Sequence, residues 1–348
     1  MGKRLTRGGP RGEARAALAI LATVIGAGFA SGREVMVFFT RFGAWSWVGI
    51  AVATAAFGVL AAGVTRLSEE TGAGSFAELC EKILGRWGGR ACAVLYGVLM
   101  AVTAGAMASG VGEIAGLTMT AGGAYWLGLG GAVVLGAVWA RRGMGALAAG
   151  GGFLLPVCGL LYVVIAWQGR RLGYAIAVRE AGGGVVGVPM AVGYACLNVT
   201  LSCGVLCEVA GKERGVERGR VVGWFAAMVG GMLAAANATL LPNAARVGSA
   251  ALPMLALARG VVPAAILATA AMLVAMMTTL VALLRSLAMM MKVGGDWVGY
   301  AVAAAVAAVC GAVGFNRIIG VAYPLMGWMS AAALLILLVV GAKWRNNA

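Results

Sequence analysis

Three glycines interrupt the first long apolar run of the chain, residues 17–39, at Gly26, Gly28 and Gly32. Glycine destabilises a helix by about 1 kcal/mol relative to alanine. At ~1.5 Å per helical residue, Gly26 lies near the middle of a bilayer that the chain enters at Arg15. Either the glycines let another helix pack closely, since Gly28 and Gly32 form a small-xxx-small pair, or the helix is broken and its freed backbone groups bind a ligand.

A second run, residues 183–204, carries the same kind of irregularity. Pro189 removes a backbone donor, and Gly193, Tyr194 and Asn198 place small and polar groups near its midpoint. Paired interrupted spans are typical of transporters: amide groups and half-helix N-termini bind a carboxylate, and freed carbonyls bind a cation. For Tyr194 and Asn198, which share a helix face, an interhelical hydrogen bond is the open alternative. The predicted substrate-binding residues are Gly26, Ala27, Gly28, Phe29, Ser31, Gly32, Tyr194 and Asn198.

Two carboxylates, Glu34 and Glu113, stand nearest the predicted external ends of the first and third spans. One interpretation is that both are solvated at the interface. The other is that one of them pairs with Arg33 as an outer gate, or carries a proton. The predicted gate residues are therefore Arg33, Glu34 and Glu113.

The composition predicts an all-α polytopic membrane protein whose principal partner is the lipid bilayer. The 348 residues are 62% hydrophobic and 11% charged, with a mean hydropathy of +0.95, whereas soluble domains are about 25% charged. The net charge of +15 comes from residues in short loops rather than on one folded face, so we predict no nucleic-acid partner. The absence of histidine and of CxxC pairs predicts no metal site.

Residues 24–30 also look like the opening of a dinucleotide-binding fingerprint. That motif needs an acidic residue about 20 positions further on, and residues 44–62 contain neither Asp nor Glu. We therefore expect no nucleotide cofactor.

The apolar runs predict one transmembrane domain over residues 1–348. Placing both termini in the cytoplasm, with the chain in the plasma membrane, puts most of the 27 Lys and Arg residues inside. Halves of five spans each, 15–167 and 183–341, would enter from opposite sides, which is the arithmetic of an inverted repeat. Residues 75–84 predict an interfacial amphipathic helix, and 242–260 a structured external loop. The ten predicted spans are 15–40, 44–65, 89–118, 122–140, 144–167, 183–209, 220–241, 261–288, 297–314 and 318–341.

A series of motifs follows one another along the chain: Gly26–Glu34, Phe38-Phe39, Phe42-Gly43, Tyr194, Asn198, Pro253–Leu255, Thr278-Thr279 and Tyr323–Gly327. These motifs resemble those of YkvI-type membrane proteins, relatives of the amino acid–polyamine–organocation transporters. The resemblance implies a LeuT-like 5+5 inverted repeat of about ten transmembrane helices, with helices 1 and 6 broken. One position departs from the pattern, since Arg33 stands where the family leads us to expect glutamine.

The same resemblance implies an ion site. In that fold, the hydroxyls of Thr278 and Thr279 and carbonyls of the first span, at Gly26 and Phe29, bind Na+ as the coupling ion, and oxygen ligands suit such a cation. The alternative is that the threonines bond to carbonyls of their own helix. Span five has no Lys or Arg that could replace the ion, which favours sodium over proton coupling.

These observations favour a secondary active transporter that moves a small organic solute, an amino acid or similar zwitterion, by alternating access. A gradient of sodium, or failing that of protons, would drive it. The alternative is a non-transporting receptor or sensor subunit with the same fold. We do not expect an enzyme, because the sequence shows no nucleophile–base pair. The oligomeric state is not indicated.

Overall fold

The computed structural model describes residues 10–24, 27–142, 184–212, 217–291 and 296–347. Within these ranges the chain is helical and contains no strand. The α-helices are α1 (Pro10–Val24), α2 (Ala27–Ala30), α3 (Arg33–Phe38), α4 (Trp45–Thr71), α5 (Phe76–Thr118), α6 (Ala124–Arg142), α8 (Gly187–Lys212), α9 (Arg218–Leu240), α10 (Ala244–Val247), α11 (Pro253–Ala258), α12 (Val262–Met291), α13 (Asp296–Gly311), α14 (Phe315–Arg317) and α15 (Tyr323–Asn347). Short 3-10 turns are η1 (Thr40–Phe42), η2 (Gly184–Val186) and η3 (Leu241–Asn243), and η4 (Ile318–Ala322) is a π-helical turn.

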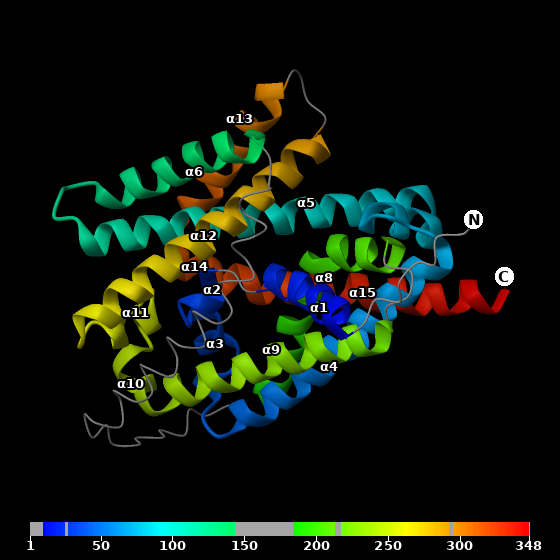
Figure 1. Ribbon diagram of the computed structural model, residues 1–348, viewed down its shortest axis with the longest axis horizontal. Coiled ribbons are helices and arrows are strands. Elements are labelled where there is room, and N and C mark those ends of the chain that lie inside the picture. The colour runs from blue at the N-terminus through cyan, green and yellow to red at the C-terminus, as the bar shows by residue number, and fades with distance from the viewer. Residues whose placement is uncertain (1–9, 25–26, 143–183, 213–216, 292–295, 348) are drawn as a thin grey trace.

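The helices pack as two groups, each of which mixes the two predicted halves of the chain. In one group α5 and α6 pack against α12 and α13, and in the other α1 and α4 pack against α8 and α9, with α15 along α8. The short helices α2 and α3 lie between the groups, where α2 contacts α12 and α3 contacts α8 and α9 (Figure 1). The part of the first span that follows α1 therefore lies between the two groups.

Seven helices in the described part of the chain are long and apolar enough to cross a membrane, and each coincides with a predicted span. The predicted span 297–314 corresponds to the shorter apolar helix α13, and the predicted span 144–167 lies outside the described residues. Large apolar side chains such as Val59, Val94, Ile266 and Leu335 are exposed on these helices. Contact of such side chains with lipid is favourable, whereas their exposure to water is unfavourable. The chain is therefore a multi-pass membrane protein.

The predicted interfacial helix 75–84 is present as a separate helical segment at the start of α5. Ser75 caps it by accepting a hydrogen bond from the Glu78 N–H, and the Glu78 carboxylate accepts one from the Gly74 N–H, a reciprocal arrangement that stabilises helix starts. Gly85, with φ 72° and ψ 179°, then reverses the direction of the helix. The rest of α5 is the third span.

The predicted break in span six is wrong, because α8 runs without interruption from Gly187 to Lys212. Pro189 lies in the first turn of α8, where the missing N–H has no helical partner to lose. Gly193 instead lies at a close helix contact: its carbonyl oxygen would lie 2.8 Å from a β-carbon placed on Gly327 of α15, whereas a β-carbon on Gly193 itself would lie 3.8 Å from its nearest neighbour. The missing side chain at Gly327 thus lets α15 pack closely on α8, which is the alternative explanation for small residues in membrane helices.

This contact predicts an asymmetric response to alanine. We expect Gly327→Ala to destabilise the protein by about 1–3 kcal/mol, since the added methyl group meets backbone atoms that cannot rotate away. Gly193→Ala is the matched control, because its nearest neighbour would lie 3.8 Å from the new β-carbon. Thermal unfolding in detergent measures both. Equal midpoints for the two variants would contradict the close packing of α8 on α15.

Candidate functional site

The first span is broken at Ser31 and Gly32, between α2 and α3. Gly32 has φ 78°, a left-handed conformation that favours glycine, and a β-carbon there would lie 2.9 Å from Cγ of Met254. The Ser31 hydroxyl donates to the Gly28 carbonyl at 3.1 Å and accepts from the Arg33 N–H at 3.2 Å. Gly28, Ser31 and Gly32 were all predicted as site residues. The observed break lies within the glycine-rich segment where an interruption of the first span was predicted. The predicted residue Gly26 lies outside the described residues, and Ala27 opens α2.

The segment between α9 and α12 folds over this break. The Met254 N–H donates to the Ser31 carbonyl at 2.9 Å. The Arg33 guanidinium donates through Nη1 to the carbonyl oxygens of Gly248 at 2.6 Å and Ala250 at 3.3 Å. The predicted structured loop is therefore present, and it supplies partners for backbone and side-chain groups of the break. In this conformation the break is closed, since Ser31 is fully buried.

Glu34 turns inward from the first turn of α3, and its side chain is only 4% exposed. Its carboxylate Oε2 accepts a hydrogen bond from the Tyr194 hydroxyl of α8 at 3.2 Å. The rest of the side chain lies on the backbone of Gly28, so closely that a β-carbon at Gly28 would overlap the carboxylate. Position 28 must therefore be glycine for Glu34 to lie in this place. The Gly28–Glu34 and Glu34–Tyr194 contacts connect α2, α3 and α8 at the break.

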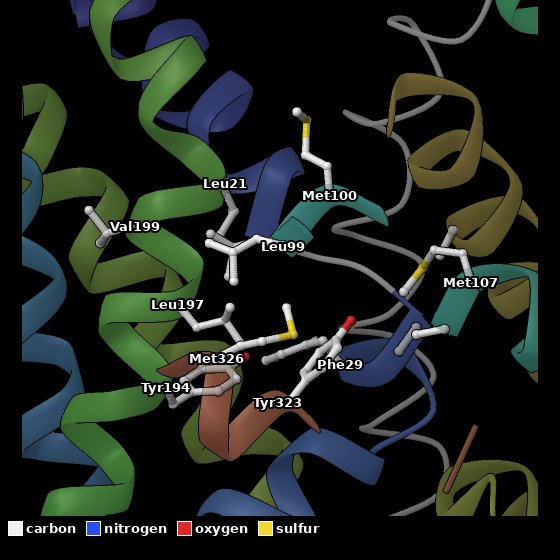
Figure 2. Packing of buried hydrophobic residues seen from close by; sticks show 14 of the residues in the cluster. Leu21, Phe29, Leu99, Met100, Met107, Tyr194, Leu197, Val199, Tyr323 and Met326 are labelled. Carbon is white, nitrogen blue, oxygen red and sulfur yellow. The ribbon is translucent and has the colours of Figure 1, made fainter. Parts of the chain in front are cut away.

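Tyr194 is enclosed by aromatic rings. Its ring centroid lies 5.1 Å from that of Phe38, 5.2 Å from Phe39 and 6.0 Å from Phe57, the last two in edge-to-face geometry. Such pairs contribute beyond their buried area. Figure 2 shows Tyr194 of α8 in the same buried cluster as Phe29 of α2 and Tyr323 of α15. The packing holds the Tyr194 hydroxyl at the break.

Asn198 lies one turn further along α8 and bonds back to it. Its Nδ2 donates to the Tyr194 carbonyl at 2.9 Å, and the Ser202 hydroxyl donates to the Asn198 carbonyl at 2.7 Å. Ser202 also shares a 2.5 Å hydrogen bond with Thr23 of α1. The hydrogen bond between α1 and α8 is thus made by Ser202 rather than by Asn198. Substrate binding by Asn198 stays a prediction.

Within the described residues, no hydrogen bond or ion pair joins the remaining predicted residues to the break, although α12 packs against α2. The Thr278 hydroxyl donates to the carbonyls of Val274 and Ala275, at 2.8 and 3.1 Å, which is the back-bonded arrangement named as the alternative. Thr279 lies beside it on α12, and Glu113 is half-buried on α5. Among the described residues neither Glu34 nor Glu113 forms an ion pair with Arg33, which bonds to loop carbonyls instead. The ion-binding and gate roles stay predictions.

Sequence reasoning missed the contact between Gly28 and Glu34. The two residues are six positions apart, a spacing that puts them on different faces of a continuous helix. Only the break at Ser31 and Gly32 folds one onto the other. The rings around Tyr194 were also missed, although the aromatic pair Phe38-Phe39 beside a predicted buried tyrosine was a signal for them.

No protein-family model matches the chain. It is similar to the "Uncharacterized membrane protein YkvI" of Bacillus subtilis (strain 168), with 37% identity over 99 residues. The match spans 28% of this chain and 28% of the relative. It supports a relation to YkvI-like membrane proteins over about a quarter of each sequence.

Proposed function

We propose that the protein is a secondary active transporter of a small organic solute, an amino acid or similar zwitterion. The observation that carries this proposal is the broken first span, buried between two groups of helices and packed against α8 at Glu34 and Tyr194. Irregular backbone in a membrane protein is tolerated where it is enclosed by protein or lines a cavity, and in transporters such segments hold the substrate.

The arrangement of the helices also supports the proposal. Spans one, two, six and seven pack together as α1, α4, α8 and α9, and spans three, four, eight and nine pack together as α5, α6, α12 and α13. Each group pairs elements from corresponding positions of the halves 15–167 and 183–341. This is the pairing that an inverted repeat of the amino acid–polyamine–organocation type requires, with alternating access by movement of one group against the other.

In this proposal the solute binds at the break. Its carboxylate is held by backbone N–H groups of residues 26–32, and its remaining groups lie against Phe29 and Tyr194. In this proposal the closed break, with Ser31 fully buried, corresponds to the occluded conformation. The chain lies in the plasma membrane with both termini in the cytoplasm, acts as a carrier rather than an enzyme, and uses sodium or protons as the driving ion. For sodium, the ligands would be Thr278, Thr279 and carbonyls of the first span.

Reconstituted full-length protein tests the proposal. Liposomes containing it are supplied with each of the twenty labelled proteinogenic amino acids in turn, under an inward sodium or proton gradient. We expect saturable accumulation of at least one amino acid, abolished when the gradient is collapsed by an ionophore. Saturable binding without accumulation would instead favour the receptor or sensor with the same fold. Neither binding nor flux of any of the twenty would contradict the proposed substrate class.

A further inference from the structure

A carboxylate buried inside a membrane protein needs a cation or a proton. The cost of an ionised acid at such a position is several kcal/mol, and it is met by a paired cation, by water or by protonation. Glu34 is 4% exposed, and its one described hydrogen bond comes from a neutral tyrosine hydroxyl. The charges on the elements around it therefore decide its state.

Among the described elements, those that pack most extensively against α3 are α2, η1, α8, α9 and η4. α2 and η4 carry no charged residue, Arg41 of η1 is exposed, and the charged residues of α8 lie in its last two turns. Arg218 and Arg220, at the start of α9, bind Glu69 and Glu13. On α3 itself, Arg33 points to the loop carbonyls. The titratable groups that face Glu34 are the hydroxyls of Tyr194 and Tyr323. Within the described residues, Glu34 has no cationic partner.

The surroundings of the Glu34 carboxylate favour a proton over a metal cation. The side chain of Glu34 lies in contact with the Gly28 backbone on one side, and the Tyr194 ring that bonds to it is enclosed by Phe38 and Phe39. A metal cation needs several oxygen ligands around it. Within the described residues, the oxygen that bonds to the Glu34 carboxylate is the Tyr194 hydroxyl, and the Ser31 carbonyl already accepts the Met254 N–H. A proton needs one oxygen and no added room.

We propose that Glu34 is the residue that binds and releases the driving proton, an inference that rests on the proposed function and makes the transporter proton-coupled. In the closed state the carboxyl group is protonated and neutral, and no bond to the solute forms. When the break opens to one side, water reaches Glu34 and the proton leaves. In the solute-loaded site, which excludes water, the ionised carboxylate cannot return to its position on Gly28, so the loaded carrier closes only with Glu34 protonated. The empty carrier returns with Glu34 ionised and hydrated in the space that the solute has left, so one proton crosses the membrane with each solute.

The first test is spectroscopic and uses pH as the probe. Infrared spectra of the full-length protein in liposomes should show the C=O stretch of a protonated carboxyl group at neutral pH. The isosteric variant Glu34→Gln should lose that component. Tyr194→Phe keeps the ring and removes the hydroxyl, so the component should persist and move to higher frequency, because a carbonyl oxygen has lost its hydrogen bond. Glu70→Gln, at an acid paired with Arg66 on the surface, is the matched control and should leave the spectrum unchanged.

The second test is functional. In liposomes under an inward proton gradient, Glu34→Gln should lose accumulation of the amino acid that the wild-type protein accumulates. It should still exchange labelled for unlabelled amino acid across the membrane, because exchange does not require the proton to be released. A misfolded variant would lose both activities, so retained exchange separates loss of coupling from loss of structure.

The outcomes of the two tests decide for or against the inference. Loss of the infrared component in Glu34→Gln, together with exchange without accumulation, supports the inference. An unchanged spectrum in Glu34→Gln, an unshifted component in Tyr194→Phe, or accumulation by Glu34→Gln under a proton gradient overturns it. Accumulation driven by sodium at any pH also overturns it and leaves the proposed transporter intact. If no amino acid moves while the infrared component is lost, the proton site stands and the proposed transport fails.

Discussion

Replacement of Gly28 by alanine is expected to destabilise the closed state and to reduce transport more than other glycine substitutions. The added β-carbon would occupy the position of the Glu34 carboxylate, so Glu34 must leave its pocket or the break must widen. Overpacking of this kind costs about 1–3 kcal/mol. Displacing the carboxylate also breaks its hydrogen bond with Tyr194, and an unpaired buried polar group costs about 1–3 kcal/mol more.

A matched control and a rescue make this prediction specific. Gly231→Ala, on α9, places its methyl group where no atom lies within 4 Å, so we expect no loss and a gain of up to about 1 kcal/mol from helix propensity. In the double variant Gly28→Ala with Glu34→Ala, the two clashing groups no longer meet, and the cost of the first change should fall by more than half. Thermal unfolding midpoints of the wild-type protein, Gly28→Ala, Glu34→Ala and the double variant give the coupling between the two positions. Additive effects of the two substitutions would show that Gly28 and Glu34 do not touch.

The second large effect is expected for Tyr194→Ala. Its ring fills the space between Phe38, Phe39 and Phe57 and is fully buried. Removing a buried aromatic ring costs about 3–5 kcal/mol, because the packing is lost and a cavity remains. Tyr194→Phe keeps the ring and loses one hydrogen bond, so the expected cost is about 1 kcal/mol.

The same measurement, thermal unfolding in detergent, separates these two variants. Trp224→Ala on α9 is the control for loss of an aromatic side chain, since Trp224 is 56% exposed and its removal leaves no internal cavity. We expect its midpoint to stay near that of the wild-type protein. A Tyr194→Ala midpoint equal to that of Trp224→Ala would show that the aromatic cluster does not hold the break together.

The membrane class and the positions of the long spans were predictable from the sequence because they depend on composition over twenty residues. The predicted starts of the second, fourth and eighth spans, at residues 44, 122 and 261, lie within a few residues of the starts of α4, α6 and α12. The break in the first span was also predictable, since Gly32 adopts a conformation that other residues avoid.

The interpretation of span six failed because a proline or glycine has two possible effects. Pro189 is harmless in a first turn and disruptive in a helix interior, and the sequence does not show where a helix begins to within two residues. Gly193 packs against Gly327, which lies 134 residues further along the chain. A contact between residues so far apart cannot be predicted from the local sequence pattern. The site at Glu34 depends on the same kind of long-range information, since Tyr194 comes from the other half of the chain.

The most direct test of the central claim is whether the closed break opens to water. In a variant with the native cysteines replaced, Ser31→Cys places a thiol at a fully buried position in the break, and Ala61→Cys places one at an equally buried position on α4. A small, water-soluble thiol reagent is applied to the protein in sealed liposomes. The account predicts that Cys at position 31 is labelled and Cys at position 61 is not, because only the break lies on a path that opens during transport. Equal protection of both thiols, with and without the amino acids and under each ion gradient, would contradict it.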